Sequence, residues 1–171
     1  MIKKIIRKDA IRLYEALGVI NLGNLSEDTL EAIMANYGAF GGVFEDVKNL
    51  RRALSERLYK GITEEERMSF FEICAKYESE YDVAEKARLY DKMRAYADII
   101  GLYEKHIAVL GSILSKEVEI NIEEVDADSF IKGILIGHKG LNIGEVRKMF
   151  APLFKEERRD TDLSELEELL K

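Results

Sequence analysis

Residues 83–115 decide the fold class, and they read VAEKARLYDKMRAYADIIGLYEKHIAVLGSILS. A mean step of 3.5 residues between large apolar side chains is typical of the seam of a left-handed coiled coil. The spacing predicts one long helix, roughly 45 Å at 1.5 Å per residue, which needs a partner of similar length. The seam residues recur at alternating steps of four and three, and they are Leu89, Met93, Tyr96, Ile100, Tyr103, Ile107, Leu110 and Leu114.

A second apolar series over residues 26–59 can supply that partner, with Ser26 as its N-cap. Gly38, Gly41 and Gly42 interrupt the series, and each glycine costs roughly 1 kcal/mol in a helix relative to alanine. They mark either a break between two helices or the close approach of a neighbouring helix. Because the apolar phase continues across the glycines, we expect a continuous or slightly kinked helix. The two long segments together predict an antiparallel hairpin.

Shorter helices are expected beside this hairpin. Apolar spacing predicts one over residues 6–17, and Thr63 with Glu66 forms a capping box that begins another. Asp82 either caps the helix after that or simply interrupts it. The apolar face predicted after the capping box consists of Phe70, Phe71, Cys74, Tyr77 and Tyr81.

The sequence changes character after Lys116. Val118, Ile120 and Ile122 alternate with polar residues, which is the period-two pattern of a half-buried strand near 117–123. One strand is not stable alone, so it must pair with an unidentified segment, a second copy or another protein. Two short helices and a last amphipathic segment over 163–170 follow. The expected fold is mainly α, with a helical bundle domain over 1–116 and a small strand-plus-helices subdomain over 117–171.

Charge is unevenly distributed along the 171 residues, whose formal net charge is −7. Apolar residues at 47% and charged residues at 35% indicate a folded, soluble protein and exclude disorder. Residues 1–60 hold 10 basic and 8 acidic groups, whereas residues 117–171 hold 8 and 14. The acidic last third repels phosphates and suits a basic protein surface. The candidate partner-binding residues are Glu117, Glu119, Glu123, Glu124, Asp126 and Asp128.

The sequence offers no motif for catalysis. His106, His138 and Cys74 are the only histidines and cysteine, and neither histidine belongs to a metal-binding motif. We therefore expect no catalytic, cofactor-binding or metal-binding residues, no cofactor and no enzymatic activity. The longest apolar run is far shorter than a membrane-spanning helix, and the charged N-terminus does not resemble a signal peptide. These features predict an intracellular protein that does not enter a membrane.

One local pattern points to another class of function. Residues 136–147, Ile-Gly-His-Lys-Gly-Leu-Asn-Ile-Gly-Glu-Val-Arg, resemble the KH-domain signature, in which two glycines let the backbone clamp single-stranded nucleic acid. The resemblance implies a nucleic-acid loop of Gly137, His138, Lys139 and Gly140. A KH domain needs two further strands after this helix, and residues 151–171 do not predict them. The alternative is a tight turn between two helices, for which glycine is an ordinary residue.

The order of segments along the whole chain resembles a loose group of small helical proteins encoded by bacteriophages and prophages, mostly of unknown function. The segments that carry the resemblance are Asp9–Leu17, Phe44–Leu54, the Val-Glu-Ile strand in Glu117–Ile122 and Leu141–Phe150. It covers residues 9–154. The resemblance implies a phage context and a binding or assembly role, with no catalytic residues.

The leading hypothesis is a non-enzymatic protein-interaction protein that presents a helical face or the strand at 118–122. Its partner would be a virion or assembly component, or a host protein whose defence or regulatory function it blocks. Self-association through the 89–114 seam or that strand is a further possibility. The resemblance places such a protein in the bacterial cytoplasm or in the virion. Single-stranded nucleic-acid binding through the 137–140 loop is the alternative function.

Overall fold

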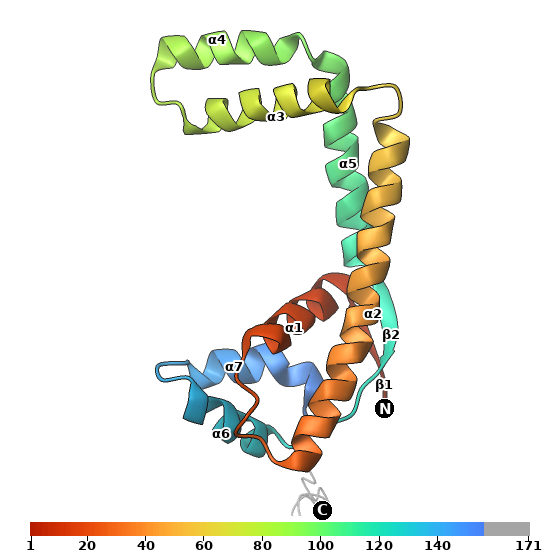
Figure 1. Cartoon of the computed structure of the whole chain (residues 1–171), viewed down its shortest axis with the longest axis vertical. Helices are drawn as coiled ribbons and strands as arrows, with labels where there is room; N and C mark the ends of the chain where they lie inside the picture. Colours follow the sequence, from red (N-terminus) through yellow and green to blue (C-terminus); the bar gives the residue numbers. More distant parts are fainter. Residues whose placement is uncertain (156–171) are drawn as a thin grey trace, which may run out of the picture. The chain divides into compact units, whose positions relative to one another are not determined.

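The computed structural model describes residues 1–155, and the protein is mainly α-helical (Figure 1). The predicted fold class is therefore confirmed, while the helix expected over 163–170 lies outside the described residues. The elements in chain order are β1 (Ile2–Ile6), α1 (Arg7–Val19), α2 (Glu27–Leu58), α3 (Glu64–Ser79), α4 (Val83–Arg94), α5 (Ala97–Ser115), β2 (Glu117–Asn121), α6 (Ala127–Gly137), α7 (Ile143–Phe150) and the short 3-10 helix η1 (Ala151–Leu153).

The chain divides into two compact units that do not follow the predicted boundary at residue 116. Among the described residues, unit 1 contains 1–3, 15–39 and 120–155, and unit 2 contains 4–14 and 40–119. Helices α1 and α2 and both strands contribute residues to each unit. The grouping of 15–39 with the C-terminal part depends on contacts between distant segments, which local sequence patterns do not encode.

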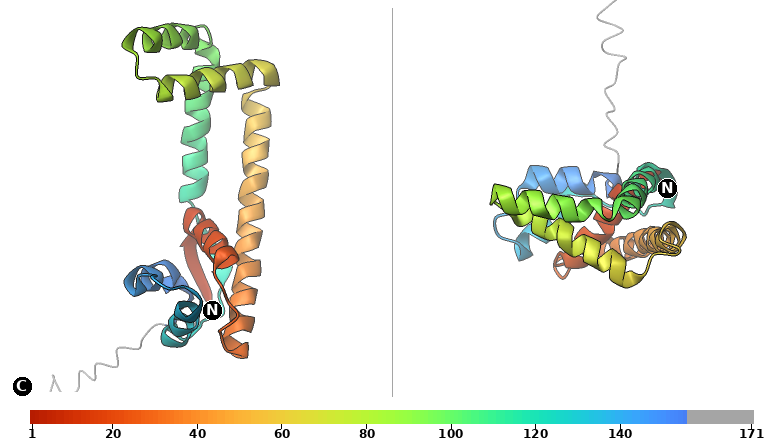
Figure 2. Two further views of the ribbon diagram at one scale, coloured as in Figure 1. Left: turned by 60° about the vertical axis from the view of Figure 1, so that its left-hand side comes forward. Right: turned by 90° about the horizontal axis from the view of Figure 1, so that it is seen from above.

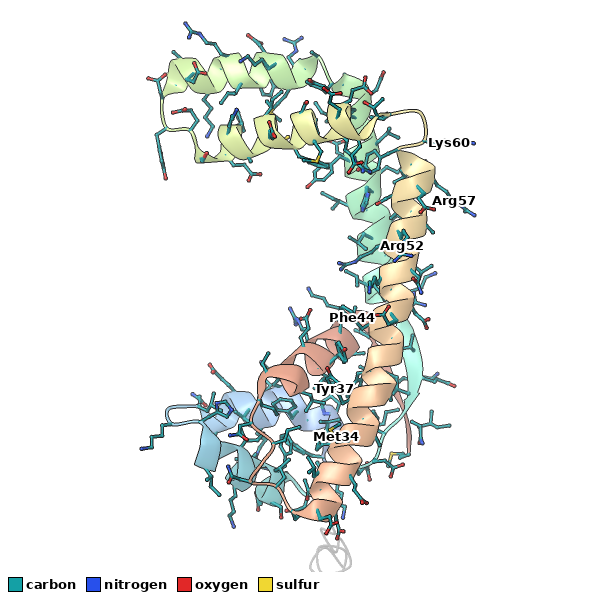
Figure 3. All side chains as sticks on the ribbon, viewed as in Figure 1. Met34, Tyr37, Phe44, Arg52, Arg57 and Lys60 are labelled. Atoms are coloured by element: carbon teal, nitrogen blue, oxygen red, sulfur yellow. The ribbon has the colours of Figure 1, made fainter. Side chains whose placement is uncertain are left out.

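Helix α2 runs without a break through its three glycines, as predicted. A Cβ atom at Gly41 would lie 3.2 Å from the Tyr14 ring, so close approach by α1 explains this glycine, whereas Gly38 and Gly42 face open space. The Tyr14 ring stacks on Phe44 with a centroid distance of 5.0 Å. Figure 3 shows Phe44 on the side of α2 that faces α1.

Residues 83–115 form two helices rather than the single helix predicted. Helix α4 ends at Arg94, and the backbone of Tyr96 leaves the helical conformation with φ −107° and ψ 34°. The Tyr96 ring packs on Phe70 of α3, with 5.9 Å between ring centroids. Helix α4 therefore folds back along α3, and the prediction of one continuous helical seam over residues 89–114 is wrong. The predicted seam is not buried along its whole length either, because Ile107 is 52% exposed. Helix α5 runs in the opposite direction to α2 (Figures 1 and 2).

The strand predicted near 117–123 is β2, and its partner is β1, which the sequence analysis missed. The backbone N–H of Arg7 donates to Lys116 and that of Ile122 donates to Met1, which fixes an antiparallel register. In this register Ile5 and Ile120 point to the buried face of the ribbon, with exposed fractions of 7% and 5%. The strand thus pairs within the chain and needs no second copy.

The core of unit 1 combines aromatic packing with one buried polar residue. The Phe130 ring lies 5.1 Å from Phe150 and 5.6 Å from Phe154, and it has no exposed surface. Asn36 is also fully buried, but its side chain donates to the carbonyl of Glu123 and accepts from the N–H of Glu123, both at 2.8 Å. The Asn36 amide therefore pairs with the backbone just after β2 in the way a neighbouring strand would, and both its nitrogen and its oxygen are hydrogen-bonded.

Candidate protein-binding surface

Helices α3 and α4 of unit 2 form an antiparallel hairpin whose ends are fixed by side-chain caps. The Thr63 hydroxyl accepts from the N–H of Glu66, and the Glu66 carboxylate accepts from the N–H of Thr63, so the predicted capping box is present. Asp82 accepts from the N–H of Glu85 at 2.8 Å, so it caps α4 rather than breaking it. Figure 2 shows the two helices side by side in both views.

The hairpin is anchored at its base by a cluster of aromatic rings. Phe70 is 2% exposed and lies between Phe71 and Tyr96, at centroid distances of 5.7 and 5.9 Å. Tyr103 of α5 contacts Phe71 edge-on at 5.5 Å. Aromatic pairs at these distances contribute about 0.5–1.5 kcal/mol each beyond the area they bury. The base therefore supplies the hairpin with its own core.

One face of α4 carries apolar side chains that this core does not use. Val83 is 83% exposed and Tyr90 is 54% exposed, and Ala87 lies between them at helical spacing. We call Val83, Ala87 and Tyr90 the α4 stripe. Tyr81, at the turn between the helices, is 97% exposed, so its predicted place on the buried face of α3 is wrong.

The α4 stripe borders an open hollow of about 440 Å³ between the two helices, which we call the hairpin groove. The ammonium of Lys86 lies 4.8 Å from the centroid of the Tyr77 ring, and the Tyr77 and Tyr90 rings are 6.3 Å apart. The cation therefore covers the ring of Tyr77 rather than the stripe. The groove is lined by Tyr77, Val83, Lys86, Ala87, Tyr90 and Asp91.

A buried polar cluster lies where the end of α2 meets α5. The Tyr59 ring is 5.7 Å from His106, and the Arg67 guanidinium lies 5.3 Å from the centre of the Tyr59 ring. The Tyr59 hydroxyl and His106 Nδ1 are buried without a hydrogen-bond partner in the described part of the chain. Burial raises the pKa of Tyr59, which keeps its hydroxyl protonated. This cluster therefore contains two buried polar atoms, the Tyr59 hydroxyl and His106 Nδ1, close to the Arg67 guanidinium.

Cys74 lies partly buried on α3, as expected for a packed thiol. Burial, with a smaller effect from the Glu78 carboxylate, raises its pKa. A thiol with a raised pKa carries little thiolate at neutral pH and is a poor nucleophile.

Half of the six predicted acidic contact residues have structural partners inside unit 1. Lys3 pairs with Glu124 at 3.0 Å and also donates to the carbonyls of Pro152 and Phe154. Asp126 caps α6 by accepting from the N–H of Ser129, and this bond lowers its pKa. Asp128, the third of these residues, pairs with Arg147 at 2.8 Å. The remaining three are exposed, and they are Glu117, Glu119 and Glu123.

The predicted nucleic-acid loop is a turn between α6 and α7 that packs against another segment of unit 1. A Cβ atom at Gly137 would lie 3.2 Å from the side chain of Asn21, so this glycine is needed for close packing. His138 Nε2 accepts a hydrogen bond from the N–H of Asn21 at 2.9 Å. Gly140 has φ +93°, and Lys139 is exposed. These contacts match the turn interpretation of the sequence.

Comparison of the chain with protein-family models, curated proteins and solved structures finds no match. Within residues 1–155, no cluster of three or more His, Cys, Asp and Glu side chains is arranged to hold a metal ion. The helices of the same region include none that is long and apolar enough to cross a membrane.

The sequence analysis missed the α4 stripe, although its signal is present. Val83, Ala87 and Tyr90 follow each other at steps of four and three, on a different face from Leu89 and Met93. Two apolar faces on one short helix indicate two neighbours. Helix α3 is the first neighbour, and although the Tyr90 ring lies 6.3 Å from Tyr77 of α3, Val83 and Tyr90 remain exposed in the described chain.

Proposed function

We propose that this protein is a non-enzymatic binding protein whose contact surface is the α4 stripe together with the hairpin groove. One observation carries the proposal. Val83 and Tyr90 retain 83% and 54% of their surface in a hairpin that is capped and anchored at its base. Single exposed apolar residues are ordinary, but a group of them around a hollow is typical of an interaction site.

The chemistry of the stripe suits a protein partner. Burying a valine or a similar apolar side chain contributes roughly 1.5–3 kcal/mol. Tyrosine is among the residues that most often dominate interface energies, because it combines apolar area with a polar hydroxyl. Val83 and Tyr90 would be the anchors, and Ala87 between them leaves room for a partner's side chain.

The partner classes remain those suggested by the resemblance to phage-encoded proteins. One is a virion or assembly component, and the other is a host protein that the chain blocks. In either case the contact we propose is the hairpin, whereas Glu124 and Asp126 serve the fold.

Co-purification from cells of the natural source, followed by mass spectrometry, tests the proposal. The tagged full chain is compared with the double variant Val83→Asp/Tyr90→Asp and with Met149→Asp, which changes another exposed apolar residue, 53% exposed on α7. We expect a partner with the unchanged chain and with Met149→Asp, and its loss from the double variant. Equal recovery with all three chains would show that the hairpin is not the contact surface.

A further inference from the structure

The hairpin groove has a shape that can accommodate a third helix. The α4 stripe presents its side chains at steps of four and three residues, and Tyr77 of α3 forms the opposite wall. An amphipathic helix carries its own apolar side chains at the same spacing, so it can lie along a groove between two antiparallel helices. Helix-in-groove contacts of this kind are a recurring mode of peptide recognition.

The free end of the hairpin carries four carboxylates and three cations over residues 76–88, and the carboxylates lie closest to the turn. Residues 78–85 contain four carboxylates and no lysine or arginine. Glu80 accepts from the N–H groups of Tyr81 and Asp82, and Asp82 accepts from that of Glu85, all at 2.8 Å. These bonds fix the positions of the Glu80 and Asp82 carboxylates. The set, which we call the acidic tip, is Glu78, Glu80, Asp82 and Glu85.

Three cations flank this set along the chain, and they are Lys76, Lys86 and Arg88. Lys86 lies over the ring of Tyr77, and Arg88 makes an exposed pair with Glu85 at 3.4 Å. Arg57 and Lys60, labelled in Figure 3, project from the end of α2, beside the base of the hairpin rather than its tip. A ligand in the groove therefore meets Tyr77, Val83, Ala87 and Tyr90, with Lys86 and Asp91 beside them, and it meets the carboxylates of the turn at one end.

We propose, building on the function proposed above, that the occupant of the hairpin groove is a cationic amphipathic helix of another protein. Its apolar side chains pack on the α4 stripe, and its lysines or arginines lie against the acidic tip. The apolar contact supplies most of the affinity, while the charges speed association and select against acidic helices. A second copy of this chain fits less well, because two acidic tips would repel each other.

A pair of synthetic peptides tests this proposal with the full-length protein. Both are about 18 residues long, enough for a helix to form, with leucines on one face. The first carries lysines on the other positions, and the second carries glutamates in their place. Fluorescence anisotropy measures each dissociation constant at low and at high salt. We expect the lysine peptide to bind, with an affinity that falls as salt is added, and the glutamate peptide not to bind.

Charge reversal in the protein locates the site. Glu78→Lys/Asp91→Lys alters the tip and the groove without removing a cap, and the matched control is Glu56→Lys/Glu104→Lys on exposed positions of α2 and α5. We expect the first variant to bind the lysine peptide about tenfold more weakly, because each reversal turns an attraction into a repulsion. The same variant is expected to begin to bind the glutamate peptide, because its new lysines attract the glutamates. The control is expected to change either affinity by less than about twofold.

Several outcomes would contradict the proposal that the occupant is a cationic helix. Equal binding of the two peptides would do so, as would equal effects of the two reversal variants. A solution mass of twice 19.6 kDa that returns to one copy in Val83→Asp/Tyr90→Asp would identify a second copy as the occupant. A natural partner that is lost with Val83→Asp/Tyr90→Asp but kept with Glu78→Lys/Asp91→Lys would leave the contact surface in place and reject only its cationic ligand.

Discussion

Phe130 in unit 1 and Tyr81 in unit 2 are both large aromatic residues, yet Phe130 has no exposed surface and Tyr81 is 97% exposed. Around Phe130 the apolar residues pack on one another, and even the buried Asn36 has both its partners. In the hairpin the base is packed, while Val83 and Tyr90 of the α4 stripe remain 83% and 54% exposed. Apolar area thus stabilises the fold in unit 1, and in the hairpin part of it remains available for a partner.

The largest effect that separates the two regions is expected from aromatic truncation. Phe130→Ala removes contacts with two other rings and leaves a cavity, which costs about 3–5 kcal/mol. Tyr81→Ala removes an exposed ring and is expected to change the free energy of unfolding by less than about 0.5 kcal/mol. Urea denaturation of both variants checks the pair. Similar losses would show that Tyr81 belongs to a core after all.

The next largest effect concerns the buried amide. Asn36→Leu leaves the N–H and the carbonyl of Glu123 without their partners, and each costs about 1–3 kcal/mol when buried. We expect a total loss of about 2–4 kcal/mol in denaturant unfolding. The same change at Asn49, on the exposed surface of α2, serves as the control and should be close to neutral. A stable Asn36→Leu protein would mean that water replaces both bonds.

A smaller effect is expected at the cap of the hairpin. Thr63→Ala removes the hydroxyl that accepts from Glu66, and loss of an N-cap costs about 1 kcal/mol. Hydrogen exchange is expected to increase in the first turn of α3 and to stay unchanged in α6. Thr63→Ser keeps the hydroxyl and should restore protection. Exchange that rises equally in both helices would indicate that the hairpin does not unfold separately.

The smallest effect compares two capping carboxylates as a function of pH. The bond from the Ser129 N–H lowers the pKa of Asp126, and the bond from the Thr63 N–H lowers that of Glu66. A lowered pKa means that the stabilisation is complete above the ordinary values of 3.8 and 4.5 and is lost as the pH falls through the folded-state values. Thermal melts from pH 6 downward are expected to flatten in Asp126→Asn and Glu66→Gln. An unchanged slope in both would contradict the assigned bonds.

Much of the local structure was predictable from the sequence, because it depends on neighbouring residues. The capping box at Thr63 and the uninterrupted helix through Gly41 follow from short-range patterns, which left open whether Asp82 caps a helix or interrupts it. Strand β1 could not be predicted in this way, because Ile5 becomes a strand residue only through pairing with β2. The turn at Tyr96 was hidden because the seam spacing continues across it, and the contact with Phe70 decides where the helix ends.

The candidate surface was only partly predictable for a related reason. A charge count identifies acidic segments but does not reveal which carboxylates already have partners. Glu124 is paired with Lys3, which lies 121 positions away along the chain. The spacing of Val83 and Tyr90 indicates a second face on α4, but only the fold shows that this face is exposed.

Site-specific photo-crosslinking tests the central claim, that the α4 stripe contacts another protein, most directly. A photo-reactive amino acid replaces Ala87 in the hairpin groove or, as a control, Ala108 on an exposed position of α5, in the full chain expressed in its natural host cells. We expect a crosslinked partner from position 87 and none from position 108. Crosslinking from position 108 but not from position 87 would contradict it.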